Sequence, residues 1–101
     1  MEKLERLVEQ AKSIVLKSSN PDRISLWRAY VALEYAILDL KLHYGLEGSP
    51  LPKPVKSADL VAAKSMIDRL NVSSSGDKKK LLYDLRSCRD IVKALVASKL
   101  R

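Results

Sequence analysis

The sequence predicts an all-α protein, a single-domain four-helix bundle that spans residues 1–101. Apolar residues recur every three or four positions in four separate stretches, which is the spacing of a helix face packed on a core. The connections between these stretches are short, long and short, as in an up-and-down bundle with one crossover. A chain of 101 residues, 47% of them apolar, is long enough for one hydrophobic core but not for two.

The first predicted helix runs from about Glu2 to Lys17, with apolar side chains on one face and charged ones on the other. Asn20 is expected to cap the next helix, and Pro21 fits its first position because the missing N–H costs nothing there. The apolar face of the first helix contains Leu4, Leu7, Val8, Ala11, Ile14 and Val15.

The second predicted helix, residues 21–44, carries two apolar faces about a third of a turn apart at roughly 100° per residue. A surface helix needs one apolar face, so this helix is expected to be buried on two sides as the core helix of the bundle. Its remaining side is expected to carry Arg28, Asp39 and His43, with Ala29, Ala32 and Ala36. The first apolar face contains Leu26, Tyr30, Leu33, Ile37, Leu40 and Tyr44, and the second contains Ile24, Trp27, Val31, Tyr35, Leu38 and Leu42.

Gly45 is expected to end the second helix with a positive φ. The alternating prolines of residues 48–54 exclude a helix and predict an extended, Pro-rich crossover. A short third helix is expected to follow, capped by Ser57 and ending near Asn71 before the loop of residues 73–76. Its predicted buried stripe contains Leu60, Ala63, Ile67 and Leu70, supported by Val61 and Met66.

The last predicted helix starts at residues 75–77 and runs to about Lys99. Its apolar seam contains Leu81, Leu85, Cys88, Val92 and Leu95, widened by Leu82, Ile91 and Val96. Beside this seam, five basic residues fall within a sector of roughly 100° of the helix circumference. This basic cluster, which is expected to lie outside the apolar seam, contains Lys78, Lys79, Arg86, Arg89 and Lys93.

The net charge of +7 lies mostly at the end of the chain, because residues 77–101 carry eight basic and three acidic groups. A one-sided basic surface predicts a polyanionic or acidic partner, contacted here through the basic cluster. Base-specific reading is not expected, so contacts with nucleic acid would be made to phosphates. The alternative is a charged face that only keeps the protein in solution.

The sequence contains few residues of the types that usually catalyse reactions or bind metals. One cysteine and one histidine exclude an internal disulfide and a structural zinc site, and no catalytic residue, metal or cofactor is expected. Cys88 is expected to behave as a small buried apolar residue, and His43 to face solvent or cap its helix. Glu34 is expected to pair with a basic residue of the first or last helix.

The N-terminal sequence and the distribution of charges favour a cytoplasmic protein. The N-terminus does not have the pattern of a signal peptide, and charged residues interrupt every long apolar stretch. Gln and Asn are scarce and Lys is abundant, which favours a heat-adapted source.

The last helix contains the run Leu85-Arg-Ser-Cys-Arg-Asp-Ile-Val-Lys-Ala94, which, together with a core helix followed by Gly and Pro, resembles HEPN domains. That resemblance implies a small helical bundle with relatives that include ribonucleases and toxin components, and a motif of Arg, a polar residue and His. Arg89 would be the motif arginine and Asp90 the polar residue. The histidine position falls on Ala94 or its two successors, so the resemblance implies a non-catalytic member kept for binding.

The leading hypothesis is a small, basic, non-enzymatic accessory subunit of a nucleic-acid-processing complex, such as a DNA polymerase holoenzyme or a ribonucleoprotein. It would act through contacts with a larger protein and through non-specific phosphate contacts. The alternatives are a degenerate HEPN-type ribonuclease or toxin–antitoxin component that uses Arg89, and a homodimer with a purely structural role.

Overall fold

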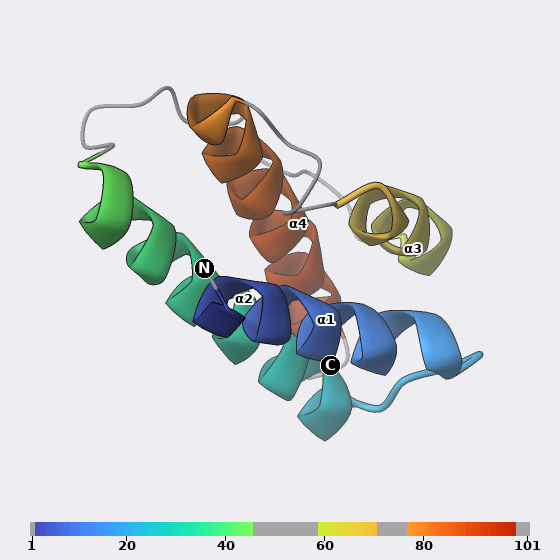
Figure 1. The fold of residues 1–101 in the computed structure, drawn as a ribbon. Coiled ribbons are helices and arrows are strands. Elements are labelled where there is room, and N and C mark those ends of the chain that lie inside the picture. The colour runs from blue at the N-terminus through green and yellow to red at the C-terminus, as the bar shows by residue number, and fades with distance from the viewer. Residues whose placement is uncertain (1, 46–58, 71–76, 99–101) are drawn as a thin grey trace.

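The computed structural model describes residues 2–45, 59–70 and 77–98, and these residues form four α-helices (Figure 1). The described part of the chain contains no strand, so the predicted all-α four-helix bundle is confirmed. The predicted crossover of residues 48–54 and the loop of residues 73–76 lie outside the described residues. The helices are α1 (Glu2–Lys17), α2 (Arg23–Tyr44), α3 (Leu60–Asp68) and α4 (Lys78–Ser98).

The helices pack as a ring of four contacts. The two long neighbours of α2 are α1 and α4, and the short helix α3 also packs against α1 and α4 (Figure 1). Within the described residues α2 and α3 do not contact each other, so they lie on opposite sides of the bundle. Helix α3 therefore does not cover a second face of α2.

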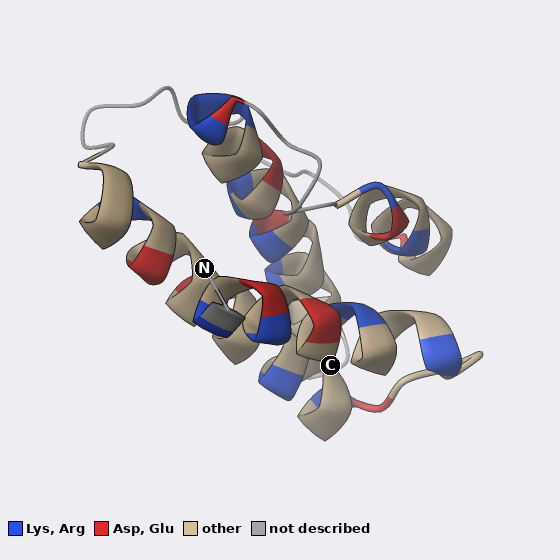
Figure 2. Ribbon diagram, in the orientation of Figure 1, with Lys and Arg blue, Asp and Glu red and all other residues tan. Residues whose placement is uncertain are grey.

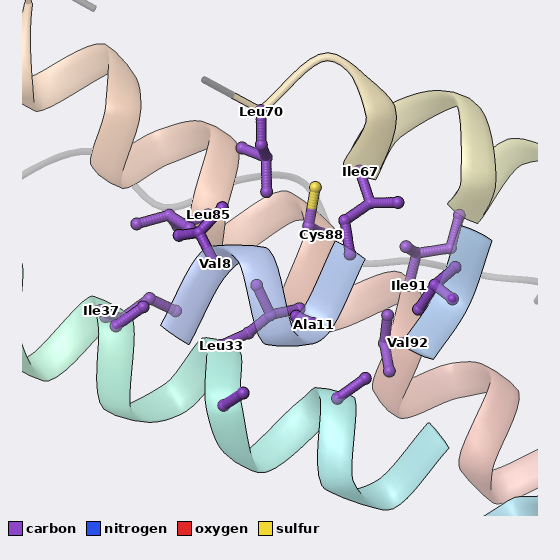
Figure 3. Close-up of a cluster of buried hydrophobic side chains, with 14 of the residues drawn as sticks. Val8, Ala11, Leu33, Ile37, Ile67, Leu70, Leu85, Cys88, Ile91 and Val92 are labelled. Atoms are coloured by element: carbon purple, nitrogen blue, oxygen red, sulfur yellow. The ribbon is translucent and has the colours of Figure 1, made fainter. Parts of the chain in front are cut away.

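The core draws side chains from all four helices (Figure 3). Every residue of the predicted α4 seam is buried, which confirms the reading of its apolar spacing. Ala63 and Ile67 of α3 and Leu70 just after it are buried as expected, whereas Leu60 is half-buried. Val61 is 75% exposed and does not support the stripe. The labelled centre of the core contains Val8, Ala11, Leu33, Ile37, Ile67, Leu70, Leu85, Cys88, Ile91 and Val92.

Aspartates begin three of the helices. Asp22 caps α2, since its carboxylate accepts a hydrogen bond of 2.7 Å from the Ser25 amide, so the expected cap at Asn20 is wrong by two positions. Pro21, expected inside the helix, precedes it and is buried. Asp59 caps α3 by accepting from the Val61 amide, so the expected cap at Ser57 is also wrong by two positions. Asp77 accepts from two amides at the start of α4.

Gly45 ends α2 as predicted. It has a φ of 58° and donates its N–H to the Lys41 carbonyl over 2.8 Å. Glycine takes this left-handed conformation without the steric cost that a Cβ would bring.

The expectation that α2 is buried on two sides is wrong. Leu26, Leu33 and Leu40 are fully buried against α1 and α4. The second apolar face lies nearly opposite the buried face and not the expected third of a turn away. Its Ile24, Val31 and Leu38 are offset by two residues, or about 200°, from the three leucines. The alanines expected on a polar side are buried instead, because the centre of the buried face falls among Ala29, Ala32 and Ala36.

A matched pair of substitutions in α2 tests this arrangement. Leu33→Ala removes a fully buried side chain and is expected to lower the free energy of unfolding by about 2–5 kcal/mol. Trp27 is 53% exposed, so Trp27→Ala is expected to cost about 1 kcal/mol or less in dilute solution. Urea unfolding followed by far-ultraviolet circular dichroism gives both values. Equal losses for the two variants would contradict the one-sided burial of α2.

Candidate interaction surfaces

The most distinctive surface of the protein is the side of α2 that points away from the core, which we call the outer face. Its five large side chains are half or more exposed, while Val31 at its centre is half-buried. Exposed apolar residues that occur singly are ordinary, but a continuous row is not. The exposed fractions are 59% for Ile24, 53% for Trp27, 57% for Tyr35, 50% for Leu38 and 75% for Leu42.

Two hollows flank the outer face at the position of Trp27. One, of about 400 Å³, lies between α1 and α2 and is lined by residues that include Leu7, Val31 and Tyr35. The other, of about 350 Å³, lies between α2 and the end of α4 and is lined by Arg23, Ile24, Trp27 and Val96. The Trp27 ring is held against the Tyr30 ring, with 5.2 Å between their centroids. The outer face is therefore a ridge with a depression on each side.

The basic cluster does not form one exposed surface. Arg86 is 7% exposed and lies among the buried residues of α4, so its expected place outside the apolar seam is wrong. The ammonium group of Lys78 lies 5.6 Å from the centre of the Tyr44 ring, which joins the start of α4 to the end of α2. Lys79 and Lys93 are exposed. Figure 2 shows basic and acidic positions interspersed along α4. Phosphate or acidic-partner binding by these residues stays a prediction.

Arg89 forms the predicted link between α4 and the acidic residue of the core helix. Its Nη1 lies 2.9 Å from Oε1 of Glu34, and its Nε and Nη2 reach Oδ1 of Asp90 at 3.0 and 2.9 Å. Burial by itself would lower the pKa of Arg89, but the hydrogen bonds to both carboxylates outweigh it and raise the pKa. Because Glu34 is 42% exposed, the pair is expected to contribute about 1 kcal/mol at most.

Two further lysines have internal partners that the sequence did not suggest. Lys12 of α1 donates to the Leu70 carbonyl just after α3, over 2.9 Å. Lys64 of α3 donates to the Ser18 carbonyl just after α1, over 2.6 Å. Each ammonium group thus satisfies carbonyl groups at the negative end of the neighbouring helix. Part of the positive charge therefore holds α1 and α3 together.

The single histidine and the single cysteine of the chain lie in different settings. His43 is exposed, and its Nδ1 lies 3.1 Å from the Asp39 carbonyl of its own helix. Cys88 borders a hollow of about 430 Å³ between α3 and α4, with Arg69 and Asp84 nearby. Burial, followed by the Asp84 charge, raises the pKa of the Cys88 thiol to about 12, although Arg69 opposes the shift. In the part of the chain that the structure describes, no three His, Cys, Asp or Glu side chains gather to hold a metal ion.

Comparisons of the chain with protein-family models, with curated proteins and with solved structures give no match. The resemblance to HEPN domains therefore stays a prediction from the sequence. In the structure the proposed motif arginine, Arg89, has two carboxylate partners, one of them the neighbouring Asp90. Over residues 2–45, 59–70 and 77–98, no helix has the length and apolar content needed to cross a membrane.

The setting of Cys88 predicts a thiol that is slow to react. With its pKa raised to about 12, the thiolate form is scarce near pH 8, and burial also blocks access. Alkylation by iodoacetamide at pH 8 is expected to be at least about 100-fold slower than in the unfolded chain, and its rate to rise with pH as the thiolate forms. Mass spectrometry of quenched samples measures both rates, with the chain in guanidinium chloride as the control. Labelling of the folded chain at the unfolded rate would contradict this setting.

Proposed function

We propose that this chain is a non-catalytic interaction subunit that binds a protein partner through the outer face of α2. The supporting observation is the row of half-exposed aromatic and aliphatic side chains directly opposite the buried face of that helix. These side chains expose on the order of 600 Å², at the upper end of the largest apolar patch on a typical monomer. A partner that covers this row would remove it from water.

The shape and composition of the outer face favour a protein over a small molecule as the partner. From Ile24 to Leu42 the row extends for about 27 Å along the helix, at 1.5 Å per residue. A small ligand is instead enclosed in a compact cavity. Trp27 and Tyr35 are residue types that carry much of the binding energy in protein interfaces, and Arg23 and Arg28 lie exposed beside them.

The non-catalytic part of the proposal rests on the setting of the candidate groups. Cys88 is buried and protonated, and Arg89 is held by two carboxylates. Neither is placed to attack or to protonate a bound phosphate. Cleavage of RNA or DNA by the purified chain that disappears in Arg89→Ala would overturn this part and favour the HEPN-type ribonuclease.

A second candidate function is non-specific phosphate binding, which would fit an accessory subunit of a nucleic-acid-processing complex such as a DNA polymerase or a ribonucleoprotein. The observation that favours it is the exposure of Lys79, Lys80 and Lys93 on α4, in a chain with a net charge of +7. Lys79 and Lys93 lie 14 residues apart and hence about 21 Å apart along the helix. Such widely separated charges suit the backbone of an extended polyanion, and this surface does not overlap the outer face.

Photo-cross-linking at two tyrosines tests the proposed interaction function. Benzoylphenylalanine replaces either Tyr35 on the outer face or Tyr83 on α4, which is 40% exposed and serves as the matched control. After irradiation in the cells that make the protein, position 35 is expected to give a discrete covalent adduct, and position 83 is not. Denaturing gels and mass spectrometry identify the adduct. Equal or absent adducts at the two positions would remove the support for this function.

A salt titration tests the phosphate-binding candidate. Two or three contacts predict a slope of roughly −2 for log affinity against log salt on duplex DNA, with micromolar or weaker affinity at physiological salt. The double variant Lys79→Glu, Lys93→Glu is expected to reduce binding to every sequence alike. Lys3→Glu, at an exposed position on α1, is the control and is expected to reduce binding less.

Arg86→Glu is expected to lower stability instead, because its side chain is buried. Fluorescence anisotropy measures the binding, and unchanged affinity in the double variant would contradict this candidate.

A further inference from the structure

We infer that the partner of the outer face is a second copy of this chain, bound as a symmetric dimer in which the two α2 helices run antiparallel and cross at Val31. This inference rests on the proposed function, since it names the partner of the same surface. Symmetric dimers use one surface patch twice, so that patch must be complementary to itself. The outer face meets that condition in its apolar pattern, its flanking charges and its shape.

The apolar pattern is symmetric about Val31. Ile24 and Leu38 lie seven positions before and after Val31, and Trp27 and Tyr35 lie four positions before and after it. A two-fold axis at Val31 brings each position level with its mirror position on the other helix. Ile24 then faces Leu38 of the second copy, Trp27 comes level with Tyr35, and Val31 meets itself. Every large exposed residue within seven positions of the axis therefore gains an apolar neighbour.

The flanking charges have an arrangement that suits antiparallel helices. Arg23 and Arg28 lie exposed beside the first half of the row, and Glu34 lies beside the second half. Asp39 is only 13% exposed and lies 3.6 Å from His43, so the negative charge offered to a second copy comes from Glu34. Antiparallel pairing brings the two arginines of one helix into the same half of the interface as Glu34 of the other. Parallel pairing would bring like charges together, which opposes association. Glu34 keeps its bond to Arg89 and is still 42% exposed.

The shape and area of the outer face are compatible with a dimer of moderate strength. The hollow of about 400 Å³ beside Trp27, Val31 and Tyr35 has room for an aromatic ring from the second copy, since a cavity of about 150 Å³ already holds benzene. Leu42 has no mirror position within α2, so four of the five exposed side chains face the second copy, and the covered area per copy is below the roughly 800 Å² per partner of a standard interface. Association in the micromolar range is therefore expected.

Hydrodynamics and the sole tryptophan test the dimer directly. Sedimentation equilibrium is expected to show a rise with concentration from 11.3 kDa toward twice that mass. Trp27 emission is expected to shift to shorter wavelength over the same range, because Trp27 is 53% exposed in the single chain. Val31→Asp places two like charges at the axis and is expected to weaken association at least tenfold. Val61→Asp on α3, where the valine is 75% exposed, is the matched control and is expected to leave association unchanged.

Engineered cysteines test the antiparallel register independently of any loss of stability in Val31→Asp. Val31→Cys is expected to form a disulfide dimer on mild oxidation. A mixture of Ile24→Cys and Leu38→Cys is expected to form the mixed disulfide, whereas two copies of either variant would hold their cysteines about 21 Å apart, beyond disulfide reach. The native Cys88 is buried and does not compete.

The outcomes separate this inference from the proposed function. Disulfides between like positions 24, or a dimer that persists in a folded Val31→Asp chain, would overturn the antiparallel arrangement. A purified chain that stays at 11.3 kDa at all concentrations, while position 35 cross-links to a different protein, would overturn the homodimer and leave the proposed function in place. A monomer with no adduct at position 35 would overturn both.

Discussion

The packing of α2 against α1 and α4 is the contact on which the rest of the structure depends. Leu26, Leu33 and Leu40 enter the core from this helix, and they are fully buried. Alanines lie between them on the same face, so the neighbouring backbones can approach closely. Because this face of α2 packs into the core, the residues about 180° away on the same helix point to solvent. The exposure of the outer face is thus a direct consequence of how the core is filled.

The positive charge of the chain serves two different purposes. Arg89 joins α4 to α2 through Glu34, while Lys12 and Lys64 join α1 and α3 by binding the carbonyl ends of each other's helices. These groups are held by local partners and are less available to an external anion. Lys79, Lys80 and Lys93 remain exposed, so any attraction to a polyanion comes from fewer groups than the net charge suggests.

The apolar residues of α2 divide in a similar way. Those of the buried face stabilise the single chain, because folding removes them from water. Those of the outer face gain little from folding, since half or more of each large side chain stays exposed. We assign this row to association because folding does not bury it and because its residues within seven positions of Val31 are arranged symmetrically about that residue. The hydrophobic effect acts on both faces. Folding removes the buried face from water, and association would remove the outer face.

By itself the sequence determined the helical class, the four elements, the apolar seam of α4, the glycine end of α2 and an ion pair of Glu34 with a basic residue of either the first or the last helix. These follow from local spacing and from residue chemistry, which a linear pattern records. Only the tertiary structure decided which of the two apolar faces of α2 is buried, because periodicity places side chains around a helix without saying where its neighbours lie. The same reason explains Arg86, whose burial depends on elements packed around α4, and Lys12 and Lys64, whose carbonyl partners are 58 and 46 residues away along the chain.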